Sequence, residues 1–262
     1  MLSSTILEFT DPDEYQVAMG RAEDHRSIIT APGSYRSELT LVGLHSVGLQ
    51  DGKLALPRVV QAAAHKEVCN IAFLTADNQA AVTFNGIEQP EPSISFQSPG
   101  TEYIVIASAD CHWGGISLTP ETLMSASRAL VGDDIATPAA SKLIHTAPHL
   151  LVRLQRLHAA TVHLALNTPD ILTHPAVAKA IEQELLSVLI ACLTDDAATI
   201  MSPNANRQQV LRRFHQVIEA NGDEPLYLPE ICTAVGVAER TLRNACMAYL
   251  GMSPHRYHGC GG

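Results

Sequence analysis

Short apolar stretches alternate with turn-forming residues along the first 118 or so positions of the chain. Glycine and proline separate them, in the sequences Ala31-Pro-Gly, Asn85-Gly, Pro90-Glu-Pro and Pro99-Gly. Many short strands with turns at this spacing are typical of an antiparallel sandwich or barrel. Residues 1–118 are therefore expected to form a β-rich domain, with strands over residues 38–44, 68–74, 81–84, 93–96, 103–107 and 113–118.

The pattern changes to a helical period after residue 118. Thr119 can cap a helix that begins with Pro120 and ends at Gly132. A second helix is expected from Ala147-Pro148, with an inner face of Leu150, Leu151, Leu154, Leu157, Thr161 and Leu164. A third follows Pro175, with an inner face of Val177, Ile181, Leu185, Val188, Leu189 and Cys192. Residues 119–198 would form a helical linker whose antiparallel hairpin covers the β-domain or, over residues 147–193, builds a homodimer.

A different helical pattern follows a polar segment at residues 199–207, which we interpret as a linker. An amphipathic helix is expected over residues 207–220, and two short helices over about 229–235 and 239–249. Gly236 lies between the short helices and can adopt the positive φ that a tight turn needs. The small Cys232 permits a close crossing, and the apolar contacts there are Ile231, Val235, Val237, Leu242 and Cys246. Residues 207–258 therefore predict a helix-turn-helix domain.

The second short helix would expose a polar face. Arg240, Arg243 and Asn244 are spaced i, i+3, i+4, so their side chains lie together. Glu239 and Thr241 flank them. Arginine pairs with guanine and asparagine with adenine in the major groove of DNA. An isolated surface arginine is usually only solvated, but the preceding turn and the clustering favour binding of duplex DNA.

At this point the sequence resembles the AraC/XylS family of bacterial transcription regulators. The matching residues are Leu228-Pro-Glu-Ile-Cys, Gly236-Val, Arg240-Thr-Leu-Arg and Leu250-Gly-Met-Ser-Pro-His-Arg-Tyr. The resemblance covers residues 207–257 and implies an α+β protein: an N-terminal β-rich, cupin-like sensor of a small-molecule effector, a helical hairpin and a C-terminal all-α helix-turn-helix. It also implies base contacts from Arg240, Arg243 and Asn244, whereas Arg256 is either a phosphate contact or a plain surface residue.

Three departures from the family pattern affect this expectation. Ala238 stands where a capping serine is common, and Cys246 where phenylalanine is common. After Tyr257, where the family continues into a second helix-turn-helix, the sequence is His-Gly-Cys-Gly-Gly. We interpret residues 259–262 as an aberrant tail produced by a frameshift, so that DNA binding would be impaired.

Composition and charge fit this interpretation. Hydrophobic residues make up 46% of the chain and charged residues 17%, as in globular proteins. The net charge is −10, yet residues 207–262 hold six arginines against five acidic residues. An acidic sensor with a near-neutral DNA-binding part is consistent with these values. The six cysteines form no C-x-x-C pair, and no secretory signal or bilayer span is evident, so a cytoplasmic, nucleoid-associated protein is expected.

Two alternatives remain beside the DNA-binding regulator. A cupin-type metal enzyme would need a histidine near the turn at residues 98–103, where Glu102 and Tyr103 stand instead, and His112 is isolated. Sequences for a nucleophilic serine or a phosphate loop are also missing, so we expect no catalysis, metal or cofactor. The other alternative is a truncated product that binds an effector or partner without DNA.

Overall fold

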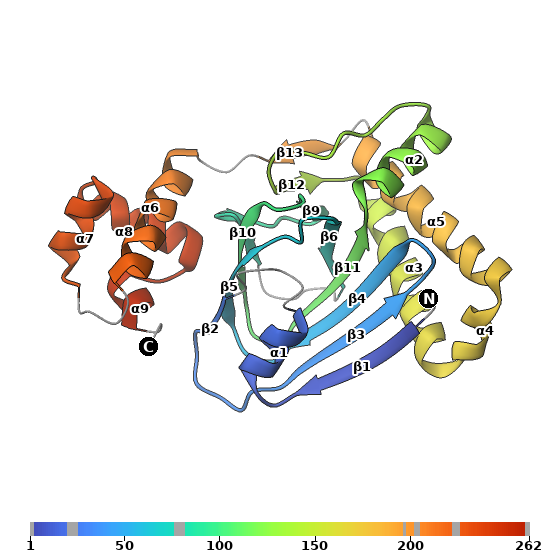
Figure 1. Cartoon of the computed structure of the whole chain (residues 1–262), viewed down its shortest axis with the longest axis horizontal. Coiled ribbons are helices and arrows are strands. Elements are labelled where there is room, and N and C mark those ends of the chain that lie inside the picture. Colours follow the sequence, from blue (N-terminus) through green and yellow to red (C-terminus); the bar gives the residue numbers. More distant parts are fainter. Residues whose placement is uncertain are drawn as a thin grey trace.

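The structure, a computed structural model, describes residues 3–19, 26–75, 82–195, 198–201, 205–221 and 226–259. Its first part is a pair of antiparallel sheets that face each other (Figure 1). The larger sheet has the order β1 (Ser3–Phe9), β3 (Ser37–Gly43), β4 (Val47–Leu54), β11 (Cys111–Leu118), β6 (Cys69–Leu74), β9 (Ser93–Gln97), β12 (Lys142–His145) and β13 (Thr199–Met201). The smaller sheet has the order β2 (Arg26–Ile29), β5 (Arg58–Ala63), β10 (Glu102–Ala107), β7 (Thr83–Phe84) and β8 (Ile87–Glu88).

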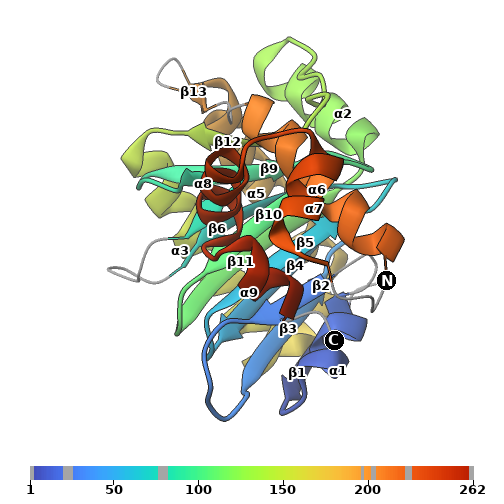
Figure 2. The same ribbon diagram turned by 90° about the vertical axis from the view of Figure 1, so that its left-hand side faces the viewer.

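Helices cover the two sheets on opposite sides of the molecule (Figures 1 and 2). One group lies on the larger sheet and comprises α2 (Pro120–Val131), α3 (Pro148–Asn167), α4 (Pro169–Thr173) and α5 (Pro175–Thr194). The other lies against the smaller sheet and comprises α6 (Ala205–Asn221), α7 (Leu228–Val235), α8 (Glu239–Leu250) and α9 (Pro254–Gly259). A further helix, α1 (Pro12–Met19), follows β1. The predicted α+β fold, with a β-rich first part and helices after it, is confirmed.

Local sequence explains the ends of the first long helix. The hydroxyl of Thr119 accepts a hydrogen bond from the backbone N–H of Thr122 at 3.2 Å, and Pro120 occupies the first turn of α2. Gly132 ends the helix with a φ of 77°. Both predicted ends are therefore confirmed.

The hairpin of α3 and α5 packs its apolar faces on the larger sheet. Leu154, Leu185 and Leu189 are completely buried in one cluster with Ile71 and Ile116 of the strands. The prediction that these stripes cover the β-domain is thus confirmed for most of their members. Val177 is an exception, because it lies in the first turn of α5 and is exposed.

Two segments differ from the prediction. Residues 142–145 were expected within a helical segment, but they form β12 and pair with β9. Residues 199–201 were expected to be a linker, but they form β13 and pair with β12. Strands of three or four residues are too short to show a period in the sequence, and each is defined by its partner strand. The predicted strand at 81–84 and the tail at 259–262 lie partly outside the described residues.

Candidate functional site

The predicted turn between the two short helices is present. Gly236 has a φ of 76°, and its N–H donates to the carbonyl of Cys232 at 2.9 Å. The N–H of Val237 donates to the same carbonyl at 3.1 Å. These two bonds satisfy the end of α7 in the manner of a left-handed C-cap, which a residue with a Cβ adopts less readily. The chain then turns sharply into α8, as a helix-turn-helix requires.

An apolar cluster fixes how the three helices cross. Phe214 of α6, Val235 of α7 and Leu242 of α8 are completely buried in it, together with Ile231 and Cys246. Val237 and Cys232 are half-buried against this cluster. The predicted contacts at the crossing are therefore confirmed.

The opposite face of α8 is polar and exposed. It carries every side chain that the sequence predicted for DNA contact on this helix: Glu239, Arg240, Thr241, Arg243 and Asn244. Arg243 Nη2 lies 2.6 Å from Glu239 Oε1, so this carboxylate orients one guanidinium. Met247 extends the same face by one turn and is 54% exposed. Helical spacing from Arg243 and Asn244 also places position 247 on this face, but Met247 was not among the predicted contacts.

Two predicted details at the ends of α8 can be compared with the structure. Ala238 is its N-cap residue and forms no side-chain capping bond, in agreement with the departure from the family pattern. Arg256, beyond α8, donates from Nη2 to the backbone carbonyl of Thr30 at 2.7 Å. In this arrangement Arg256 ties α9 to the residue that follows β2.

The helix-turn-helix unit rests on the smaller sheet. Gln61 of β5 makes a double contact, since its Nε2 donates to Nδ1 of His215 at 2.9 Å and its Oε1 accepts from the hydroxyl of Tyr257 at 3.0 Å. Apolar contacts surround this "Gln61 bridge", with Ile28, Val59, Ile104 and Ile106 of the sheet packed in the same cluster as the helices. Sequence reasoning missed this interface, because alternation along a strand does not reveal what covers its second face.

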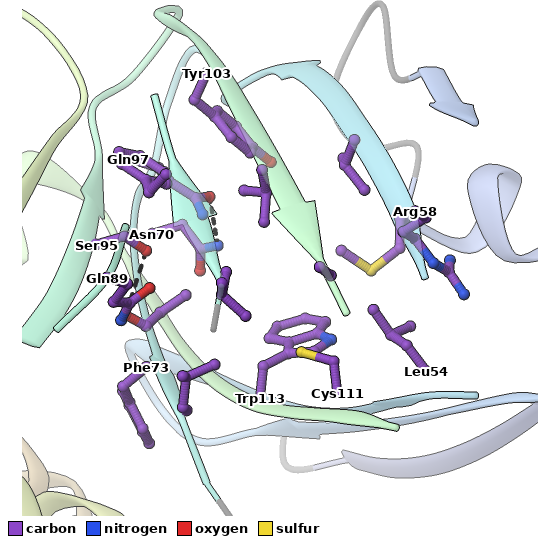
Figure 3. Close-up of a pocket in the computed structure, with 18 of the residues that line it drawn as sticks. Leu54, Arg58, Asn70, Phe73, Gln89, Ser95, Gln97, Tyr103, Cys111 and Trp113 are labelled. Carbon is purple, nitrogen blue, oxygen red and sulfur yellow. Dashed lines mark hydrogen bonds between the residues drawn. The ribbon is translucent and has the colours of Figure 1, made fainter. Parts of the chain in front are cut away.

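A cavity of about 110 Å³ lies between the two sheets (Figure 3). Phe73, Leu74, Val105 and Trp113 are among the mainly apolar residues that line it. A neighbouring cavity of about 220 Å³ shares Asn70, Gln97 and Tyr103 as wall residues. A single water needs only about 10–15 Å³ by this measure, so the interior has room for a small molecule.

Ionisable groups of the cavity wall are neutral except for one. Burial raises the pKa of Cys111 to about 11 and that of Tyr103 to about 12. Burial also raises the pKa of Tyr15. The remaining ionisable residue among the described wall residues is Arg58, whose guanidinium side chain is completely buried.

The residues considered for a metal site, Glu102, Tyr103 and His112, do not form a cluster of metal ligands. Within the described ranges, no three histidine, cysteine, aspartate or glutamate side chains lie close enough to hold a metal ion. Glu102 is exposed and its carboxylate lies 3.7 Å from Nε of Arg212 in α6, so it belongs to the interface between the sheet and the helices. The expectation that no metal is bound stays a prediction. The described helices also include none that is long and apolar enough to cross a bilayer.

No protein-family model matches the chain. Its fold is similar to that of an AraC-like transcriptional activator, CuxR, with a TM-score of 0.55 and 14% sequence identity over 99% of this chain and 96% of that one. ToxT from Vibrio cholerae with an unsaturated fatty acid bound gives a TM-score of 0.35 at 7% identity, over 83% of this chain and 79% of that one. The likeness to CuxR shows that the chain shares the fold of this AraC-like activator.

Proposed function

We propose that the protein is a transcription regulator that binds duplex DNA with α8 and senses a small molecule with its β-domain. One observation carries the proposal: an exposed helix face with two arginines and an asparagine follows directly after a left-handed turn at Gly236. In a helix-turn-helix, this second helix is the one that enters the major groove. The shared fold with an AraC-like activator supports the same function.

Each polar residue of the face has a role in this proposal. The planar guanidinium groups of Arg240 and Arg243 would pair with guanine O6 and N7, and the carboxamide of Asn244 with adenine. Thr241 and Glu239 lie at the start of the helix, where a hydroxyl can reach a phosphate and a carboxylate can accept from cytosine N4. Glu239 would exchange its ion pair with Arg243 for a base contact or keep Arg243 in place.

Two strands, β5 and β10, offer a route from the sensor to the DNA-binding unit. Val60 and Val105 pair across these strands and line the cavity, whereas their neighbours Gln61 and Ile104 pair one position along and touch the helices. Side chains alternate between the faces of a strand, so one backbone shift would move both surfaces. Docking of the helices would thereby respond to an occupant of the cavity.

The Gln61 bridge provides a test of this route. Gln61→Leu removes both hydrogen bonds and should release the helix-turn-helix unit from the sheet, at a cost of about 1–2 kcal/mol to docking. DNA affinity measured by fluorescence anisotropy is expected to change in this variant, whereas Gln16→Leu, at a half-buried position on α1, should leave it unaltered.

A homodimer through residues 147–193 is also proposed. Its support is a set of exposed apolar side chains on α3 to α5, which a partner subunit would cover: Val152, Leu166, Ile171 and Val177. Analytical ultracentrifugation tests the homodimer separately from DNA binding: the wild type should sediment as a dimer, and Val152→Glu as a monomer.

Selection of bound duplexes from fragmented genomic DNA, followed by titration, tests the DNA-binding proposal. Arg240→Ala, Arg243→Ala and Asn244→Ala are each expected to weaken the selected duplex by about 1–3 kcal/mol and to relax specificity at one base pair. Arg128→Ala, which removes an exposed arginine on α2 outside the proposed dimer surface, is the matched control and should bind as the wild type does. Failure of the wild type to enrich any sequence would overturn the proposal.

A further inference from the structure

Arg58 is a buried charge that has no counter-charge among the described residues. Its side chain is completely buried, and its guanidinium lies 5.0 Å from the ring centroid of Tyr15 and 5.2 Å from that of Tyr35. Nη1 donates to the hydroxyl of Tyr35 at 3.2 Å and Nη2 to that of Ser37 at 3.0 Å. Nε is buried and has no hydrogen-bond partner. No carboxylate in the described part of the chain lies within ion-pair distance of this guanidinium.

A charge in this environment is unfavourable unless something compensates it. Burial of an ionised group away from water costs free energy, and buried charges in proteins are normally paired. Two neutral hydroxyl groups and two ring faces compensate only in part. The guanidinium therefore remains an attractive place for an anion.

The surroundings of Arg58 limit what that anion can be. Among the described residues that line the cavity between the sheets, Arg58 is the one charged side chain, and apolar residues form most of the wall. A dianion such as a phosphate monoester would bring one negative charge more than the wall can neutralise. A monoanion with an apolar body matches both the charge and the lining.

Hydrogen-bonding groups occupy the far side of the same cavity. Figure 3 shows Asn70, Ser95 and Gln97 on the side opposite Arg58. Asn70 Nδ2 donates to Gln97 Oε1 at 2.9 Å, but Asn70 Oδ1 is buried and has no partner. This oxygen can accept a hydrogen bond from a ligand whose other end carries a donor.

We propose that the cavity binds a small monocarboxylic acid with an aliphatic or single-ring body, its carboxylate paired with Arg58. This inference rests on the proposed sensing function and names its ligand class. An Arg–carboxylate pair supplies charge-assisted hydrogen bonds with fixed geometry, and it satisfies the buried charge. The competing role for Arg58 is purely structural: its contact with the ring of Tyr15 would hold α1 on the β-domain, and no ligand would be needed.

Matched ligand pairs on the wild-type chain distinguish these roles. Octanoate and phenylacetate are compared with octanamide and phenylacetamide by isothermal titration calorimetry and thermal unfolding, without DNA. Each acid is expected to bind saturably, roughly tenfold to a hundredfold more tightly than its amide, because only the acid pairs with the guanidinium. Equal binding of acid and amide, or binding of neither acid, would overturn the proposal.

Variants then locate the site. Arg58→Met should remove the preference for the acid and Arg58→Lys should restore part of it, whereas Arg36→Met, which removes an exposed arginine, should bind as the wild type. If the Arg58 variants do not fold, the comparison of acid and amide on the wild type still distinguishes a ligand-binding role from a purely structural one. If the wild-type chain binds DNA but neither acid, this inference fails and the DNA-binding proposal stands. If it binds the acids but no DNA sequence, the DNA-binding proposal fails and this inference stands.

Discussion

The β-domain is covered by helices on two sides, and the two interfaces differ in kind. On the larger sheet, α3 and α5 insert completely buried leucines between buried side chains of several strands. On the smaller sheet, the described residues buried beneath the helix-turn-helix are Ile28 and Val59, and Ile104 and Ile106 are half-buried. Polar contacts through Gln61, Arg256 and Glu102 complete this second interface.

This difference indicates one permanent and one separable interface. An extensive apolar contact cannot open without exposing much of the core, so the hairpin folds as part of the β-domain. Contacts between domains that are smaller and more polar are compatible with relative motion. Under the proposed function, helices docked on the second kind of surface would respond to a ligand in the β-domain, whereas helices docked on the first kind would not.

The largest effect is expected on the permanent interface. Leu189→Ala in α5 or Leu154→Ala in α3 leaves a cavity in the core and should lower the free energy of unfolding by about 2–5 kcal/mol. Guanidinium denaturation of the whole chain measures this loss. Leu130→Ala, exposed on α2 outside the proposed dimer surface, is the control and should change it by less than about 0.5 kcal/mol. Equal effects of Leu154→Ala and Leu130→Ala would contradict a tightly packed hairpin.

A single methyl group should open the separable interface. A Cβ at Gly86 would lie 2.6 Å from Cε2 of Tyr249, so Gly86→Ala pushes α8 away from the β7–β8 turn. Gly132→Ala is a matched control, because Gly132 has a similar positive φ but no atom within 4 Å of the added methyl group. Small-angle scattering should show a larger radius of gyration for Gly86→Ala only. An unchanged radius in both variants would mean that the helices do not separate from the sheet.

A smaller, pH-dependent effect is expected at the permanent interface. His158 of α3 is completely buried, with Nε2 2.8 Å from the carbonyl oxygen of Gln50, and burial lowers its pKa. The unfolded chain therefore binds a proton before the folded one does, and stability should fall as the pH drops below about 6.5. Urea unfolding at several pH values should show a weaker decline in His158→Gln than in the wild type. His149 is exposed on the same helix, so His149→Gln is the control and should lose stability at low pH as the wild type does. An equal loss of stability in His149→Gln and His158→Gln would exclude His158 as the cause.

Regular, locally determined features could be predicted from the sequence. The helical period gave α3 and α5, and the left-handed tendency of glycine gave the ends of α2 and α7. Exposure of Arg240, Arg243 and Asn244 also followed from helical spacing alone. Their contact with DNA stays a prediction.

Features that depend on distant contacts could not be predicted. Nothing local to Lys142–His145 specifies a strand, because β9 supplies its pairing. Gln61 and Arg58 are ordinary polar residues in an alternating stretch, and only the folded chain places one under Tyr257 and the other between two tyrosine rings. The charge of Arg58 in an apolar strand was the one available signal that this position is special.

The central claim is that α8 enters the major groove of DNA. A photocrosslinking side chain at Thr241, on the exposed face of α8, tests it most directly when compared with the same side chain at Val152 on the opposite side of the molecule. The account predicts that the Thr241 variant crosslinks to bases of the selected duplex, and that the Val152 variant does not. Crosslinking from Val152 alone, or from neither position to a duplex that the protein binds, would contradict it.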